Sequence, residues 1–200
     1  MSAARIQIRP ATVQDVPQIL AFIRELAVYE RLAHEVVASE ADLAASLFGT
    51  RPYAEVVLGC LDGAPVGFAL FFHNYSTFLG KPGIYLEDLF VRAEARGHGL
   101  GKRLLAYLAR TALERGCGRL DWSVLDWNAP SIGFYRRLGA VALDDWTTFR
   151  LSGPALDAVA CIAAILPNGA TRGHAGAEVF GLIPQGVAIT FSTGVVASER

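Results

Sequence analysis

Residues 85–91 read YLEDLFV and are followed by RGHGLGK at residues 96–102. The first part is mostly apolar and predicts a strand, and the second places three glycines just before a helical pattern. Backbone N–H groups at a helix N-terminus bind phosphate oxygens, because the first turn leaves them without partners and the helix dipole is positive there. The junction therefore predicts a phosphate-binding turn, to which Arg96 and Lys102 add positive charge.

Two common phosphate-binding motifs do not match this run. A Walker loop is disfavoured because Lys102 is followed by Arg103 rather than Ser or Thr, and because Arg96 stands where its first glycine would be. The dinucleotide fingerprint is disfavoured because its third glycine would fall at Lys102. The glycines alone thus indicate phosphate binding, and a nucleotide-hydrolysing enzyme is a weaker alternative.

The rest of the pattern predicts a sheet covered by helices. Strands are expected at residues 6–9, 54–61, 66–72, 84–91, 120–125, 141–143 and 147–151, and helices after Thr12, after Ser39, at 99–116, at 129–138 and after Ser152. Asp62-Gly63 predicts a tight hairpin turn. The class is α+β, an α/β mixed sheet that is mostly antiparallel with flanking helices, and the helix at 99–116 makes a parallel crossover.

Composition limits the partners. The chain has 200 residues and a net charge of -1, so one domain and no nucleic-acid partner are expected. Cysteines and histidines lack ligand spacing, so no metal is expected. The start of the chain lacks a signal-peptide pattern and no long apolar run occurs before residue 160, so we expect no membrane and a cytoplasmic location. Residues 161–200, with four charged side chains, form a C-terminal extension of unknown role.

Two motifs together resemble the GNAT superfamily of N-acetyltransferases. Residues 85–91 and 96–101 match its acetyl-CoA motif, Arg-x-x-Gly-x-Gly, and LDWNAPS at 125–131 with Phe134 and Tyr135 resembles its second coenzyme motif. The likeness covers residues 5–160, the expected N-acetyltransferase domain. It is strongest to the spermidine/spermine (diamine) and thialysine N-acetyltransferase branch, through residues 25–27 with 29–30, 85–88 and 127–128.

The resemblance implies the GNAT-type acyl-CoA N-acyltransferase fold, with a bulged strand at 84–91 that splays from its neighbour. It also implies acetyl-CoA as co-substrate. Residues expected on the coenzyme are Leu89, Phe90, Val91, Arg96, Gly97, His98, Gly99, Leu100, Gly101, Lys102, Asn128, Ala129, Pro130 and Ser131. Residues expected near the amine are Tyr29, Glu30, Glu87, Asp121, Trp122 and Ser123.

The chemistry needs a base and an acid. An amine with a pKa near ~10.4 is protonated at neutral pH and must lose a proton before it attacks the thioester. Neighbouring strand residues point to opposite faces, so only one of Glu87 and Asp88 is expected to face the site. The resemblance selects Glu87, acting directly or through water, and selects Tyr135 as the acid for the thiolate.

Several alternatives stay open at this point. Direct transfer in a ternary complex is preferred over an acetylated Cys117, which has no histidine near it in sequence. The acceptor is expected to be a small primary amine, namely a diamine, a polyamine or a thialysine-like amino acid; an antibiotic amine or a protein N-terminus is less favoured. Phe78 stands where thialysine-type enzymes carry tryptophan. A non-catalytic acyl-CoA-binding or regulatory module is the alternative function, and a homodimer is possible.

Overall fold

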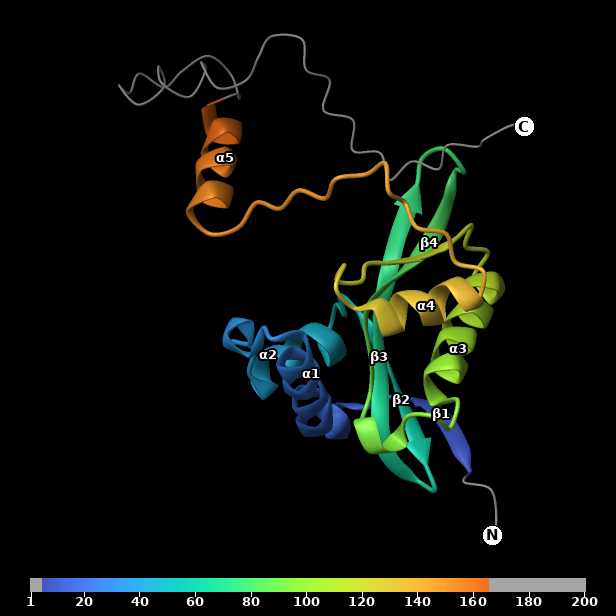
Figure 1. Ribbon diagram of the computed structural model, residues 1–200. Helices are drawn as coiled ribbons and strands as arrows, with labels where there is room; N and C mark the ends of the chain where they lie inside the picture. The colour runs from blue at the N-terminus through green and yellow to red at the C-terminus, as the bar shows by residue number, and fades with distance from the viewer. Residues whose placement is uncertain (1–4, 166–200) are drawn as a thin grey trace, which may run out of the picture. The chain divides into compact units, whose positions relative to one another are not determined.

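A computed structural model of the chain describes residues 5–165. The elements, in chain order, are β1 (Ile6–Pro10), η1 (Val13–Asp15), α1 (Val16–Glu30), η2 (Ala33–Glu35), α2 (Glu40–Phe48), β2 (Glu55–Leu61), β3 (Ala64–Ser76), β4 (Lys81–Val91), η3 (Ala93–Ala95), α3 (Leu100–Glu114), β5 (Leu120–Trp122), α4 (Ala129–Arg137) and α5 (Pro154–Ile165). Figure 1 shows these elements along the chain. They fall into two compact units, residues 5–132 and residues 133–165.

The first unit is built on a mixed sheet of five strands. Their order is β1-β2-β3-β4-β5, with antiparallel pairing throughout except for the parallel pair β4 and β5. The turn between β2 and β3 places Asp62 at φ 49° and Gly63 at φ 88°. Two successive positive φ angles match the twist of the flanking strands, so the expected hairpin turn is confirmed, as is the fold class.

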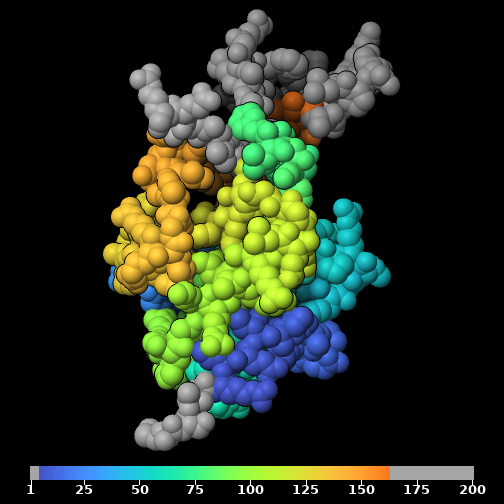
Figure 2. Space-filling model, turned by 90° about the vertical axis from the view of Figure 1, so that its right-hand side faces the viewer, coloured from blue at the N-terminus to red at the C-terminus, as the bar shows by residue number. Residues whose placement is uncertain are grey.

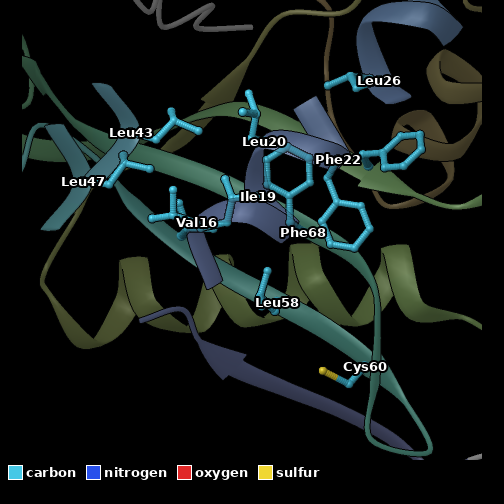
Figure 3. Close-up of a cluster of buried hydrophobic side chains, with 12 residues drawn as sticks. Val16, Ile19, Leu20, Phe22, Leu26, Leu43, Leu47, Leu58, Cys60 and Phe68 are labelled. Carbon is cyan, nitrogen blue, oxygen red and sulfur yellow. The ribbon is translucent and has the colours of Figure 1, made fainter. Parts of the chain in front are cut away.

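Helices α1 and α2 cover one face of this sheet (Figure 1). Phe22 of α1 stacks on Phe68 of β3 with ring centroids 5.7 Å apart. Ile19, Leu20 and Leu58 surround this pair in Figure 3. Burying a side chain of the size of Phe22 stabilises the fold by about 1.5–3 kcal/mol, so this apolar cluster fixes α1 on the sheet.

Helix α3 covers the opposite face, where Figure 2 shows it in yellow-green beside the blue β1. Its apolar side, which includes Leu100, Leu104 and Leu108, is fully buried. Gly59 of β2 permits this approach, because a Cβ atom there would lie 2.8 Å from a methyl group of Leu100. The sheet therefore carries α3, with its glycine-rich N-terminus, on the side opposite to α1.

A β-bulge interrupts β4 at Glu87. On β3, Leu70 pairs with Asp88 and the next residue, Phe71, pairs with Leu86, so Glu87 is an extra residue in the ladder. A bulge of this kind bends the strand and increases its twist. It confirms the bulge that the resemblance implies.

Two expectations about strands after residue 116 are wrong: the length of β5 and the strand pair at residues 141–151. Strand β5 ends at Trp122 rather than at residue 125, because its partner β4 diverges at the bulge. Residues 141–151 form no strand pair. Val141 and Phe149 are 84% and 89% exposed, so a hairpin of such short strands would bury too little apolar surface to be stable. The short helix expected after Ser152 is confirmed as α5, whereas residues 166–200 of the expected extension lie outside the described part.

Candidate active site

Only the first half of β4 is paired with β5. Pairing between them runs from Ile84 with Leu120 to Leu86 with Trp122 and stops there. Among the described residues, positions 88–91 pair with β3 alone. Unpaired N–H and C=O groups of such an edge can accept an extended ligand as an additional strand. Leu89, Phe90 and Val91 are thus placed where the resemblance expects the pantetheine arm.

The N-terminus of α3 provides the phosphate-binding turn. Gly97 and Gly99 both adopt φ +82°, and a Cβ atom at either would meet no atom within 4 Å. Gly99 is the N-cap residue, and no acidic side chain occupies the first turn. The amides of Leu100, Gly101 and Lys102 have no partner in the preceding turn of the helix. These residues fit a pyrophosphate group, because open space, positive helix dipole and free donors coincide.

Two side chains of the same turn fold back onto the backbone. The Arg96 Nε donates to the carbonyl oxygen of Val91 at 2.9 Å. The His98 ring Nδ1 lies 3.1 Å from the carbonyl oxygen of Arg96 and therefore acts as the donor. These bonds hold the turn in shape before any ligand binds.

Two carboxylates, Glu87 and Asp88, lie at the bulge of β4. Leu86 pairs with Phe71 and Leu89 pairs with Ala69, so both lie on the α3 side of the sheet. Asp88 pairs with Leu70, which packs against the core beneath α1, so Asp88 is directed toward the α1 side. Glu87 is the extra residue beside it, and because strict alternation does not hold across a bulge, the expectation that the two carboxylates occupy opposite faces stays a prediction.

Like charges gather at this bulge. Burial raises the pKa of Asp88 to about 6, and the nearby carboxylates of Glu87 and Glu30 contribute to this rise. Burial also raises the pKa of Glu30, the last residue of α1. Such a cluster favours a bound cation, because a positive group would relieve both the repulsion and the desolvation of the carboxylates.

Asn128 fixes the start of α4. Its Oδ1 accepts a hydrogen bond from the amide of Ser131 at 3.3 Å, which makes it the N-cap of the helix. The side chain is 5% exposed, and its Oδ1 also accepts a bond from the Tyr29 hydroxyl at 3.2 Å. Ala129, Pro130 and Ser131 form the first turn of α4, directly after this cap.

Two of the residues expected near the amine, Asp121 on β5 and Ser123 directly after it, already have partners in the protein. Asp121 forms an ion pair with Arg119, with Oδ2 and Nε 2.7 Å apart, and accepts a bond from Asn74 at 2.9 Å. The Ser123 hydroxyl lies 2.8 Å from that of Tyr85. Their contact with an amine, like that of Trp122, stays a prediction.

Tyr135 belongs to the second unit, on the part of α4 after Ile132. Its ring centroid lies 5.2 Å from that of Phe134, and its carbonyl oxygen accepts bonds from Leu138 and Ala140. These contacts close the end of α4 in a compact turn. Its role as the acid stays a prediction.

The sequence does not predict the surroundings of Asp88 and Trp127. The resemblance selects Glu87 rather than Asp88, and the burial that raises the pKa of Asp88 depends on tertiary packing. The sequence indicates Trp127 only as part of a motif. In the structure its ring centroid lies 5.9 Å from that of Tyr29, and the guanidinium carbon of Arg31 lies 5.5 Å above the Trp127 ring. An aromatic residue beside a coenzyme motif is the signal that would have indicated such a contact.

Within residues 5–165, no helix is both long and apolar enough to cross a membrane. The same range holds no group of three or more His, Cys, Asp or Glu residues arranged to bind a metal ion.

Known proteins resemble the chain along most of its length. Residues 20–140 match the model of the Acetyltransferase (GNAT) family. L-ornithine N5-acetyltransferase of Arabidopsis thaliana is 36% identical, covering 76% of this chain and 87% of that protein. Thialysine N-epsilon-acetyltransferase of Bos taurus is 39% identical, covering 76% and 96%.

A structural relative supports the same grouping. An integron cassette protein from the mobile metagenome of V. cholerae superimposes with a TM-score of 0.66 at 27% sequence identity, covering 78% of this chain and 97% of that one. Its fold, the family match over more than half of the chain and the open strand edge beside the glycine turn agree with one another. The chain belongs to the GNAT family and is an acetyl-CoA-dependent N-acetyltransferase.

Proposed function

We propose that the protein transfers the acetyl group of acetyl-CoA to the side-chain or terminal primary amine of a small cationic molecule, by direct attack in a ternary complex. The observation that carries this proposal is the group of carboxylates formed by Glu30, Glu87 and Asp88 at the bulge of β4, next to the point where the pairing of β4 with β5 stops. The acceptors that fit this charge are diamines, polyamines and amino acids with a second amine, such as ornithine and thialysine. The names of the curated relatives agree with the last group.

The carboxylates have two tasks in this reaction. They attract the ammonium form of the substrate, and one of them removes its proton so that the nitrogen lone pair can attack the thioester carbon. Glu87 lies on the bulge and is our proposed base, acting directly or through one water. Asp88, whose pKa is about 6, can take up or share this proton near neutral pH.

The remaining groups bind the coenzyme and release the thiol. The amides at the start of α3 hold the pyrophosphate, and the open edge of β4 holds the pantetheine arm. When the tetrahedral intermediate collapses, its C–S bond breaks and the thiolate takes a proton from the Tyr135 hydroxyl. A phenol with a pKa near ~10 is a competent donor to a thiolate.

A thiol-release assay tests this function. Purified protein with acetyl-CoA is offered putrescine, spermidine, ornithine, lysine, thialysine and an aminoglycoside, and free thiol is followed with a chromogenic disulfide. Release with at least one of the small diamines or amino acids supports the proposal. Release with none of these amines, together with measurable acetyl-CoA binding, supports instead the acyl-CoA-binding module.

A further inference from the structure

The C-terminal end of α1 contacts two loops that are far apart in sequence. The ring of Tyr29 lies 5.9 Å from the ring of Trp127, and the guanidinium of Arg96 stands 5.0 Å from the centre of the Tyr29 ring. The Tyr29 hydroxyl is bonded to Asn128 at 3.2 Å. We call Tyr29, Arg96, Trp127 and Asn128 the Tyr29 clasp.

The chemistry of Asn128 determines the direction of the central hydrogen bond. The amide of Ser131 only donates, so the side-chain atom of Asn128 that faces it must be the carbonyl oxygen. The same oxygen faces Tyr29, whose hydroxyl is therefore the donor. Asn128 is 5% exposed, so loss of this hydroxyl would leave a buried acceptor with one partner fewer.

The other side of the clasp is Arg96, the first residue of the glycine-rich run. Its Nε donates to the carbonyl oxygen of Val91, the last residue of β4, while its guanidinium stacks on Tyr29. The side chain of Arg96 thus contacts both the end of β4, through Val91, and the end of α1, through Tyr29. A cation stacked on the face of an aromatic ring is attracted to it, so this contact stabilises the position of the Arg96 side chain.

The two loops that Tyr29 connects come directly after β4 and β5, the two strands whose pairing stops at Leu86 and Trp122. Arg96 lies in the connection after β4, and Asn128 lies in the connection after β5. Both contain residues assigned to the coenzyme, whereas the carboxylates of the amine site lie on β4 and at the end of α1.

We propose that Tyr29 is a positioning residue for the coenzyme: its ring and hydroxyl tie the Arg96 turn to Asn128 at the start of α4 and hold open the spacing that acetyl-CoA needs. The inference rests on the proposed function, and it moves Tyr29 from the amine site, where the family resemblance placed it, to the coenzyme side. Glu30, its neighbour, keeps its place with the carboxylates.

Three variants of the full chain test this role. Tyr29→Phe removes only the hydroxyl, Asn128→Ala removes its acceptor, and Tyr53→Phe removes the hydroxyl of a tyrosine that is 72% exposed before β2 and serves as the control. The dissociation constant of acetyl-CoA is measured by calorimetry, and KM and kcat are measured with the best amine from the thiol-release assay.

We expect Tyr29→Phe to weaken acetyl-CoA binding about two- to tenfold, since a hydrogen bond contributes about 0.5–1.5 kcal/mol and 1.4 kcal/mol is tenfold. The KM of the amine should stay within about twofold, and Tyr53→Phe should change neither. In the Asn128→Ala background, the further change to Phe at position 29 should have little effect, because the two residues share one bond.

The inference is overturned if Tyr29→Phe raises the amine KM while acetyl-CoA binding is unchanged, which would return Tyr29 to the amine site. Full additivity of the Tyr29 and Asn128 effects would equally overturn it. Failure of the proposed function looks different, because the unaltered protein would then bind no acetyl-CoA or release no thiol with any amine.

Discussion

Replacing Asp88 by asparagine should stabilise the protein without its ligands and weaken its binding of the amine. The asparagine side chain has the same shape as the aspartate but carries no charge that Glu87 and Glu30 could repel. The stabilisation follows from the raised pKa of Asp88, about 6 in the folded chain against 3.8 for a free side chain. Ionising this carboxyl at neutral pH therefore costs the folded state free energy.

The magnitude follows from linkage. Each pKa unit corresponds to about 1.4 kcal/mol, so the full cost of the charge is about 3 kcal/mol. Asp88 is half-buried, and solvent screening leaves about 1–3 kcal/mol. For a chain of this size, this gain should raise Tm by about 3–10 °C at pH 8.

The sign depends on pH. Between the unfolded pKa of 3.8 and the folded pKa of about 6, the folded state binds more protons, so its stability falls as the pH rises. Above pH 7 the whole penalty is present, and at pH 5 about half of it remains. The advantage of Asp88→Asn should therefore be about twice as large at pH 8 as at pH 5.

Thermal denaturation at both pH values, together with amine KM, measures these effects. The matched control is Glu114→Gln, which neutralises a carboxylate in the exposed pair with Arg110 and should shift stability by less than about 0.5 kcal/mol. An equal gain for Asp88→Asn at pH 5 and pH 8 would refute the electrostatic explanation. So would a variant that is less stable than the parent at pH 8.

Three further predictions concern other parts of the chain. Tyr135→Phe should lower kcat about 10²–10⁴-fold, the usual contribution of a general acid, and leave the calorimetric affinity for acetyl-CoA nearly intact; an unchanged kcat would remove Tyr135 from the mechanism. Asp15→Asn should destabilise the fold by about 1–2 kcal/mol at pH 7 in urea denaturation, because Arg9 and Thr12 stabilise the carboxylate and hold the pKa of Asp15 well below its usual range. That deficit should shrink as the pH falls below about 4 and the aspartate is protonated; a deficit independent of pH would contradict this explanation. Gly99→Ala should lower the free energy of unfolding by about 1 kcal/mol, seen as a lower Tm, and should weaken acetyl-CoA binding, because residue 99 must adopt φ +82°. An unchanged Tm and affinity would show that the turn tolerates another shape.

Much of the fold was readable from local patterns. The helix with Val16, Ile19 and Leu20 on its buried side, the hairpin at Asp62 and the glycine turn before α3 each depend on neighbours in sequence. Their signals come from helical periodicity, from positive φ and from capping chemistry, which short-range interactions determine. The strands expected at residues 141–151 do not form, because apolar alternation alone does not supply the pairing partner that a strand needs.

Local sequence patterns predict only part of the arrangement of the active-site residues. Local patterns are enough to predict a phosphate-binding turn after a strand that carries Glu87 and Asp88. The closeness of Glu30 to these carboxylates could not be predicted in this way, because it depends on the pairing of β4 with β3 and on where α1 ends. Likewise, the glycines could be recognised from their spacing, whereas the contact of Tyr29 with Arg96 and Asn128 arises from residues up to 99 positions apart. The conformation of the glycine-rich turn depends on neighbouring residues in the sequence, whereas the contacts around it depend on packing between distant segments.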